Sequence, residues 1–196
     1  MSAVTPGAAM IGIVDYDAGN LKNVQAALDR LGAPWTSVAR PEDLDGVSRV
    51  ILPGVGRFGA ASRRLREAGL GAPLREFALS GRPFLGICLG MQLLFEDSEE
   101  DPDEAGLGVL EGRVRRLRAK PLPHIGWATV VPVVRGPGTL FEGLPERFDA
   151  YFAHSFAVPA TDRHAAALAL GPAPFAAAVA SGSTWGVQFH PEKSGE

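Results

Sequence analysis

The first half of the chain alternates short apolar runs with amphipathic segments. The run Ile11–Asp15 favours a buried strand, and Asn20–Leu31 repeats apolar residues at helical spacing before Gly32. The alternation continues with strands expected at Trp35–Val38, Val47–Leu52 and Pro83–Ile87, and helices at Ala60–Ala68, Leu74–Leu79 and Met91–Phe95. Strands that alternate with helices form right-handed βαβ units. This half therefore predicts a mostly parallel sheet flanked by helices on both faces.

The second half is dominated by short runs that are typical of strands. They lie at Arg113–Leu117, Ile125–Val134, Tyr151–Val158, Ala165–Leu170, Phe175–Ala180 and Trp185–Phe189. Proline and glycine clusters separate several of these runs, which favours antiparallel hairpins. We therefore expect a single α/β domain over residues 1–196, in which the C-terminal half adds antiparallel strands. Residues 1–9 are expected to be a loose N-terminal extension, so that either Met1 or Met10 is the true start.

Composition narrows the class of protein without indicating its chemistry. The 196 residues are 46% hydrophobic and 21% charged, which suits a globular core, and a net charge of −3 gives no argument for nucleic acid or an anionic membrane. A single cysteine excludes internal disulfides, and the sequence has no signal peptide or membrane span, so we expect a reducing cytoplasm. The four histidines lie far apart, so neither a metal nor another cofactor is expected.

The only cysteine, Cys88, lies where a predicted strand passes into a predicted helix. The sequence Gly86-Ile-Cys-Leu-Gly90 matches the nucleophile elbow G-x-S-x-G with cysteine in place of serine. Its glycines permit a sharp turn that raises the side chain above the sheet, and a helix N-terminus favours the thiolate. The backbone N–H of Leu89 is then free to face an oxyanion. We predict that Cys88 is a nucleophile; a buried structural cysteine is the alternative.

His190 and Glu192 directly follow the predicted strand Trp185–Phe189. Pro191 keeps His190 extended, and residues two apart in an extended segment share a side. Glu192 can therefore orient His190, whose other ring nitrogen serves Cys88, as in a triad of nucleophile, base and orienting carboxylate. Both motifs follow strand ends, where open α/β sheets place their sites. The alternative for this segment is an exposed strand end with an incidental ion pair.

The segment Gly54–Gly59 matches the dinucleotide-binding pattern G-x-G-x-x-G but lacks its context. It follows the third predicted strand rather than the first. Instead of an acidic residue at a strand end about 20 residues further on, the chain has Glu76 inside a helical segment. We instead expect this loop to bring backbone N–H groups close to a reacting carbonyl, as a second oxyanion donor.

Three other features are less decisive. Gln92 lies one turn after Cys88 and either binds an amide or amino-acid substrate or is an exposed helix residue. His154, inside a strand-like run, is more typical of a structural histidine. The acidic run Ser98–Asp101 is expected to be a solvated loop.

Taken together, Gly86–Gln92 and His190–Glu192 resemble the class I (triad) glutamine amidotransferases, and the match spans nearly the whole chain. More narrowly, the sequence is similar to the glutaminase subunits of imidazole glycerol phosphate synthase. The stretches that carry this likeness are Asp15–Asn20, Leu52–Gly56, Pro123–Trp127, Tyr151–Ser155 and Gly186–Ser194. Two departures stand out: Ala128 replaces the usual asparagine, and relatives continue past the position of Glu196 into a final helix.

The resemblance implies a flavodoxin-like sheet and hydrolysis of glutamine to glutamate and ammonia. It also implies a (β/α)8-barrel cyclase subunit, bound as a heterodimer, that uses the ammonia in histidine biosynthesis. By position, it makes Cys88 the nucleophile, His190 the base and acid, and Glu192 the orienting carboxylate. The remaining roles fall to oxyanion donors at Val55, Gly56 and Leu89, and to substrate-binding residues Gln92, Glu100, His154 and Ser155.

The resemblance further implies that the partner controls the glutaminase. Asn20 and Asn23 follow a strand end, and Lys193 follows the triad directly, so we expect these three side chains at the partner interface. The glycine-flanked loop Pro53–Gly56 is the element most able to adjust its backbone.

Other functions remain open on the sequence alone. The same triad would serve the glutaminase subunit of another synthase or a γ-glutamyl hydrolase. A reading from a different class is an elbow-cysteine protein that senses oxidants or binds a partner, which needs Cys88 but not His190 or Glu192.

Overall fold

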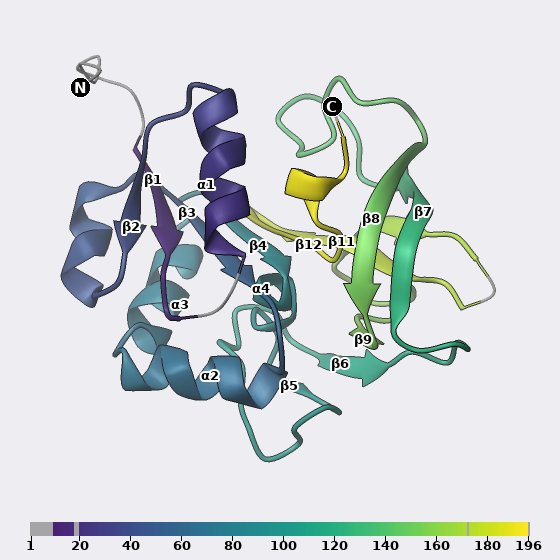
Figure 1. Ribbon diagram of the computed structural model, residues 1–196, viewed down its shortest axis with the longest axis horizontal. Coiled ribbons are helices and arrows are strands. Elements are labelled where there is room, and N and C mark those ends of the chain that lie inside the picture. Colours follow the sequence, from purple (N-terminus) through teal and green to yellow (C-terminus); the bar gives the residue numbers. More distant parts are fainter. Residues whose placement is uncertain (1–9, 18–19, 172, 196) are drawn as a thin grey trace.

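The computed structural model describes residues 10–17, 20–171 and 173–195, so the expected extension at residues 1–9 lies outside the described residues (Figure 1). The helices are α1 (Leu21–Arg30), α2 (Phe58–Glu67), α3 (Gly71–Leu79) and α4 (Leu89–Gln92), with 3-10 turns η1 (Pro41–Gly46) and η2 (Pro191–Lys193). The strands of the first half are β1 (Ile11–Val14), β2 (Trp35–Val38), β3 (Arg49–Gly54), β4 (Phe84–Cys88) and β5 (Asp97–Ser98). Those of the second half are β6 (Arg113–Arg116), β7 (His124–Pro132), β8 (Phe148–His154), β9 (Phe156–Ala157), β10 (Ala165–Ala169), β11 (Phe175–Ser181) and β12 (Thr184–Val187).

The main sheet has nine strands in the order β2-β1-β3-β4-β12-β11-β10-β7-β8. From β2 to β12 neighbouring strands are parallel, and from β12 to β8 they are antiparallel. A smaller sheet pairs β5, β6 and β9. The predicted α/β class, with antiparallel strands added by the C-terminal half, is confirmed. The last strand of the chain, β12, lies beside β4, which brings the segment after residue 187 next to Cys88.

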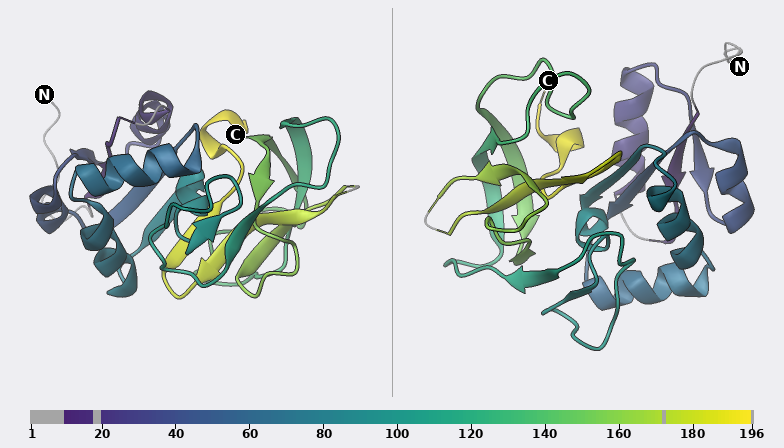
Figure 2. Two further views of the ribbon diagram at one scale, coloured as in Figure 1. Left: turned by 90° about the horizontal axis from the view of Figure 1, so that it is seen from below. Right: turned by 180° about the vertical axis from the view of Figure 1, so that it is seen from behind.

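Helices cover both faces of the parallel strands, as Figures 1 and 2 show from opposite sides. Successive side chains of a strand point to opposite faces. Ile13 accordingly packs in a cluster with Val24 and Leu28 of α1, whereas Val14 packs in a cluster with residues of α2 and α3 such as Leu65. No helix of the described part of the chain is long and apolar enough to cross a bilayer.

The structure corrects the predicted ends of several elements. α2 begins at Phe58 rather than Ala60, because the carboxylates of Glu100 and Asp101 accept the backbone N–H groups of Phe58 and Gly59. The expected solvated loop at Ser98–Asp101 is therefore only partly right: Glu99 is exposed in a turn, but Ser98 is buried in β5, and the side chains of Glu100 and Asp101 hold α2 in place. This contact joins segments more than 40 residues apart, which local periodicity does not report.

The predicted strand Tyr151–Val158 is interrupted at Ser155. Residues up to His154 pair with β7 in the main sheet, whereas Phe156 and Ala157 pair with β6 in the small sheet. The predicted helix Met91–Phe95 is also displaced, since α4 begins at Leu89 and ends at Gln92. Beyond Leu93 the hydrogen bonds of Leu94 and Phe95 span three residues instead of four, as in a tightened last turn.

Candidate active site

Cys88 occupies a strained turn between β4 and α4. Its backbone angles, φ 54° and ψ −109°, are rare for a residue with a side chain. The flanking glycines are required by close approach: a Cβ on Gly86 would lie 2.6 Å from the carbonyl oxygen of Gly90, and one on Gly90 would lie 1.8 Å from that of Leu52. The glycines thus let the chain turn tightly enough to present Cys88, as the elbow motif predicted.

The helix that follows the elbow is shorter than the sequence suggested. α4 contains four residues, so few peptide dipoles are aligned behind Cys88, and the predicted helix N-terminus is a minor source of positive potential. All four α4 residues are buried. Side-chain donors around the sulfur therefore matter more than the sequence analysis assumed.

His190 lies just after β12, the strand next to β4, and its backbone is anchored to β8. Its backbone N–H donates to the carbonyl of Tyr151 at 2.9 Å, and its side chain is 2% exposed. His190 is extended, with φ −101° and ψ 93°, as Pro191 requires. Beyond it the chain does not stay extended, because residues 191–193 form the turn η2. The geometry proposed for the pair was therefore wrong, although the turn still brings Glu192 Oε1 to 2.9 Å from His190 Nδ1.

The charges of this pair support each other. Burial lowers the pKa of His190, but hydrogen bonds and charge interactions with Cys88 and Glu192 outweigh it and raise the pKa to about 9. Burial raises the pKa of the Glu192 carboxyl, and hydrogen bonds from His190 and Asn20 bring it below its ordinary value. Glu192 is therefore ionised at neutral pH and stabilises a protonated imidazole.

Asn20 takes part in the same network. Its Nδ2 donates to Glu192 Oε1 at 2.7 Å and lies 3.4 Å from His190 Nδ1, while Asn23 donates to Asn20 Oδ1 at 2.7 Å. Asn20 has a left-handed backbone, φ 80°, which asparagine tolerates better than most residues. Asn20 and Asn23 are predicted at a partner interface. In the structure Asn20 turns its side chain inward to the carboxylate of Glu192.

A cavity of about 320 Å³ opens above Cys88. Its lining includes all the residues predicted as oxyanion donors or substrate contacts, together with three others of the predicted set: Val55, Gly56, Leu89, Gln92, Glu100, His154, Ser155, Cys88, His190 and Lys193. Pairing of Gly54 with Cys88 in the sheet places the loop after β3 directly beside the elbow. The structure thus gathers segments from both halves of the chain around one thiol.

Two substrate candidates are already engaged by the protein. Gln92 is buried, not exposed on a helix, and both donations from its Nε2 are used, to the carbonyl of Phe156 at 2.9 Å and to Gln188 Oε1 at 3.0 Å. One oxygen of Glu100 accepts from the backbone of α2.

Lys193, predicted at the partner interface, is exposed, with its Nζ 5.9 Å from the centre of the Tyr151 ring.

Gln188 was not predicted as a site residue, yet its Nε2 lies 3.6 Å from the sulfur of Cys88. A signal was present: Gln188 interrupts an apolar run and stands two residues before His190. Residues two apart in an extended chain share a side, so a polar side chain there points toward the same site.

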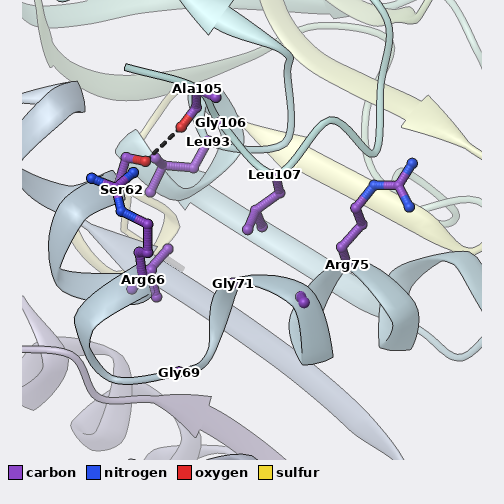
Figure 3. Close-up of a pocket in the computed structure, with 11 residues that line it drawn as sticks. Ser62, Arg66, Gly69, Gly71, Arg75, Leu93, Ala105, Gly106 and Leu107 are labelled. Atoms are coloured by element: carbon purple, nitrogen blue, oxygen red, sulfur yellow. Dashed lines mark hydrogen bonds between the residues drawn. The ribbon is translucent and has the colours of Figure 1, made fainter. Parts of the chain in front are cut away.

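A second cavity, of about 430 Å³, lies between α2, α3 and the segment 105–107 (Figure 3). Ser62 donates to the carbonyl of Ala105 at its edge, and Arg66 is paired with Glu104. It is lined by none of the residues gathered around Cys88.

Comparison with known proteins agrees with this arrangement. The family model described as glutamine amidotransferase class-I matches residues 12–196. The "Imidazole glycerol phosphate synthase subunit HisH" of Desulfitobacterium hafniense is 46% identical over 187 residues, covering 94% of this chain and 88% of that protein. The longer "Imidazole glycerol phosphate synthase hisHF" of Emericella nidulans is 41% identical over 95% of this chain and 36% of its own length.

The fold comparison points the same way. A solved structure titled "Crystal structure of glutamine amidotransferase" superimposes with a TM-score of 0.75 and 25% identity, covering 93% of this chain and 90% of that one. The match of the family model and the 46% identity to a HisH subunit confirm the resemblance noted in the sequence. The chain belongs to the class-I glutamine amidotransferases and, within them, to the family of the HisH subunits of imidazole glycerol phosphate synthase.

Proposed function

We propose that the chain hydrolyses the side-chain amide of glutamine to glutamate and ammonia, and passes the ammonia to a cyclase subunit in histidine biosynthesis. The observation that carries this proposal is the cavity in which Cys88 faces the pair His190 and Glu192. In this proposal the three residues form a catalytic triad, with Cys88 as nucleophile. A free thiol of this kind suits a reducing cytoplasm, where we propose that the protein acts.

In the first half-reaction the sulfur of Cys88 bonds to the amide carbon, and the thiol proton passes to His190. The hydrogen bond and negative charge of Glu192, which raise the pKa of His190, help the imidazole to hold that proton. The carbonyl oxygen becomes an oxyanion, which the backbone N–H groups of Leu89 and of the Val55–Gly56 loop stabilise. Collapse of the intermediate breaks the C–N bond, and the proton on His190 goes to the leaving nitrogen, giving ammonia and a glutamyl thioester.

In the second half-reaction water replaces the thiol. His190, now neutral, accepts a proton from the water as its oxygen bonds to the thioester carbon. The second oxyanion collapses, the C–S bond breaks, and the proton returns to the sulfur of Cys88. The sum is glutamine plus water giving glutamate plus ammonia. Glu192 keeps His190 oriented and stabilises its charge in both halves.

Gln92 is proposed to recognise the amino-acid end of the substrate. Both donations of its Nε2 are to protein acceptors, so its Oε1 is the atom left to accept from the ammonium group of glutamine. Glu100 adds negative charge at the same end. The pKa of His154 is lowered to about 4, chiefly by burial, so this histidine is neutral and shapes the wall beside Ser155.

The partner is proposed to dock on the outer face of β7. Ile125 and Trp127 share that face and are 62% and 57% exposed. Tyr151 of β8 lies opposite Trp127, with ring centres 6.2 Å apart, and Lys193 connects this patch to the cavity mouth. Exposed aromatic residues beside a cation are typical anchors of protein interfaces. The relatives' names, with "subunit" in one and a fused hisHF in the other, support such a partner.

Titration with the cyclase subunit tests both parts of the proposal. With glutamine present, we expect glutamate release to rise and saturate as the cyclase is added. Trp127→Ala should raise the half-saturating cyclase concentration about tenfold or more, because a central tryptophan anchor is lost. Leu31→Ala is the matched control, since Leu31 is 77% exposed but lies at the end of α1. No glutamate release by the wild-type complex would contradict the proposed activity, and an unchanged Trp127→Ala titration would contradict the docking face.

A further inference from the structure

Gln188 is a fully buried side chain with a fixed orientation. Gln188 is 0% exposed. Its backbone N–H donates to the carbonyl of Ala177 at 2.8 Å, and its Oε1 accepts from Gln92 Nε2 at 3.0 Å. Because the oxygen is engaged by Gln92, the amide must present its nitrogen to the other side, where the sulfur of Cys88 lies 3.6 Å away. Gln188 is thus a neutral donor held against the nucleophile.

Gln92, which holds the amide of Gln188, is itself fixed by a chain of hydrogen bonds between neutral groups. The second hydrogen of Gln92 Nε2 goes to the carbonyl of Phe156, which also lies 2.9 Å from His154 Nδ1. With its pKa lowered by burial to about 4, His154 carries one ring hydrogen at neutral pH, and the carbonyl requires it on Nδ1. His154 Nε2 then accepts from His124 Nδ1 at 3.4 Å. Each member has one orientation that satisfies its neighbours.

A purely structural amide would not need this arrangement. Thr184, another buried polar side chain on the same segment, bonds to the backbone carbonyl of Ala78. Gln188 instead directs its donor at a sulfur, a weak acceptor as a thiol and a strong one as a thiolate. The hydrogen bond therefore gains strength when Cys88 ionises, at the point in the reaction where a nucleophile is needed.

We propose that Gln188 is a positioning residue that donates a hydrogen bond to the Cys88 thiolate and fixes the sulfur for attack, with its own amide oriented by Gln92. Only the substrate-binding role of Gln92 rests on the proposed function; the contact between Gln188 and Cys88 does not. In this proposal Gln92 binds the substrate and also holds the amide of Gln188, which in turn contacts the sulfur of Cys88. The two side-chain amides therefore align the substrate with the sulfur.

The test is the pH profile of Cys88 alkylation by iodoacetamide in the isolated chain. Cys88 is the only cysteine, so each added mass reports this thiol. We expect Gln188→Met, of similar length but without a donor, to move the midpoint up by about one pH unit. Gln188→Glu should move it further, because a carboxylate then faces the sulfur. Thr184→Val is the matched control and should leave the profile unchanged.

Turnover gives a second readout. In complex with the cyclase, Gln188→Met should lower kcat for glutamine about tenfold and leave KM within about twofold, because the lost bond serves the nucleophile and not the substrate. A folded Gln188→Met chain whose alkylation profile overlays the wild type would overturn the proposal. Wild-type alkylation with no glutaminase activity would instead count against the proposed function alone.

A measurement on the wild-type chain tests the proposal even if the Gln188 variants fail to fold. The side-chain amide resonance of Gln188 in a ¹⁵N-labelled chain should shift as Cys88 ionises, and the shift should vanish once the thiol is capped as a methyl disulfide. A resonance that does not follow the thiol would overturn the proposal as firmly as an unchanged alkylation profile.

Discussion

Replacing Cys88 with alanine is expected to abolish glutamine-dependent synthesis by the complex while ammonia-dependent synthesis continues near the wild-type rate. Cys88 carries only the formation and hydrolysis of the thioester, so ammonia supplied from outside bypasses it. Loss of a nucleophile that acts within a triad typically lowers kcat by about 10⁴-fold or more. The measurement is product formation by the complex with glutamine or with an ammonium salt as nitrogen source.

The control for this experiment is assembly of the complex. Cys88 is 5% exposed, and the smaller alanine side chain fits the same turn, so the variant should fold and bind the cyclase as the wild type does. Equal loss of both activities in a correctly assembled complex would mean that Cys88 supports the structure and not the hydrolysis.

The second large effect is expected at His190. His190→Ala should lower glutamine turnover about 10⁴-fold, because it removes the group that accepts and returns the proton. Glu192→Gln should be milder, since it keeps the shape and a carbonyl oxygen but loses the charge that stabilises the imidazole. Asn20 continues to donate to that oxygen, which helps to hold the substituted side chain.

The double variant distinguishes a triad from two independent contributions. If Glu192 acts only through His190, His190→Ala combined with Glu192→Gln should be little slower than His190→Ala alone. The turnover rates of the wild type, the two single variants and the double variant, measured at saturating glutamine in the complex, give this comparison. Losses that multiply in the double variant would argue against a shared triad.

Short-range pattern was sufficient for the strands of the main sheet and for the elbow. Apolar periodicity located every main-sheet strand to within a few residues, and the spacing of Gly86, Cys88 and Gly90 predicted the turn that presents the thiol. These features depend on neighbours in sequence. Pro191 likewise kept His190 extended because proline restricts the residue before it.

Contacts between distant segments were not accessible in the same way. The contact of Asn20 with Glu192, 172 positions away, was not predicted from its place after a strand end. The acidic run was expected in solvent because charged residues are normally exposed, yet Glu100 and Asp101 satisfy the first N–H groups of α2. Gln188 was passed over as part of a strand: its spacing from His190 indicated the side it faces, but its contact with Cys88 depends on the position of β12 beside β4.

The most direct measurement of the central claim is glutamate release from glutamine by the chain alone, with the cyclase, and with the cyclase and its nucleotide substrate. We predict slow release alone and an increase of about 10²–10³-fold in the full system, the effect expected when one oxyanion donor near the Pro53–Gly56 loop is brought into place. In the full system the amount of glutamate released should then equal the amount of product that the synthase forms. No release in any of the three conditions would contradict the account, and full activity of the chain alone would contradict its control by the partner.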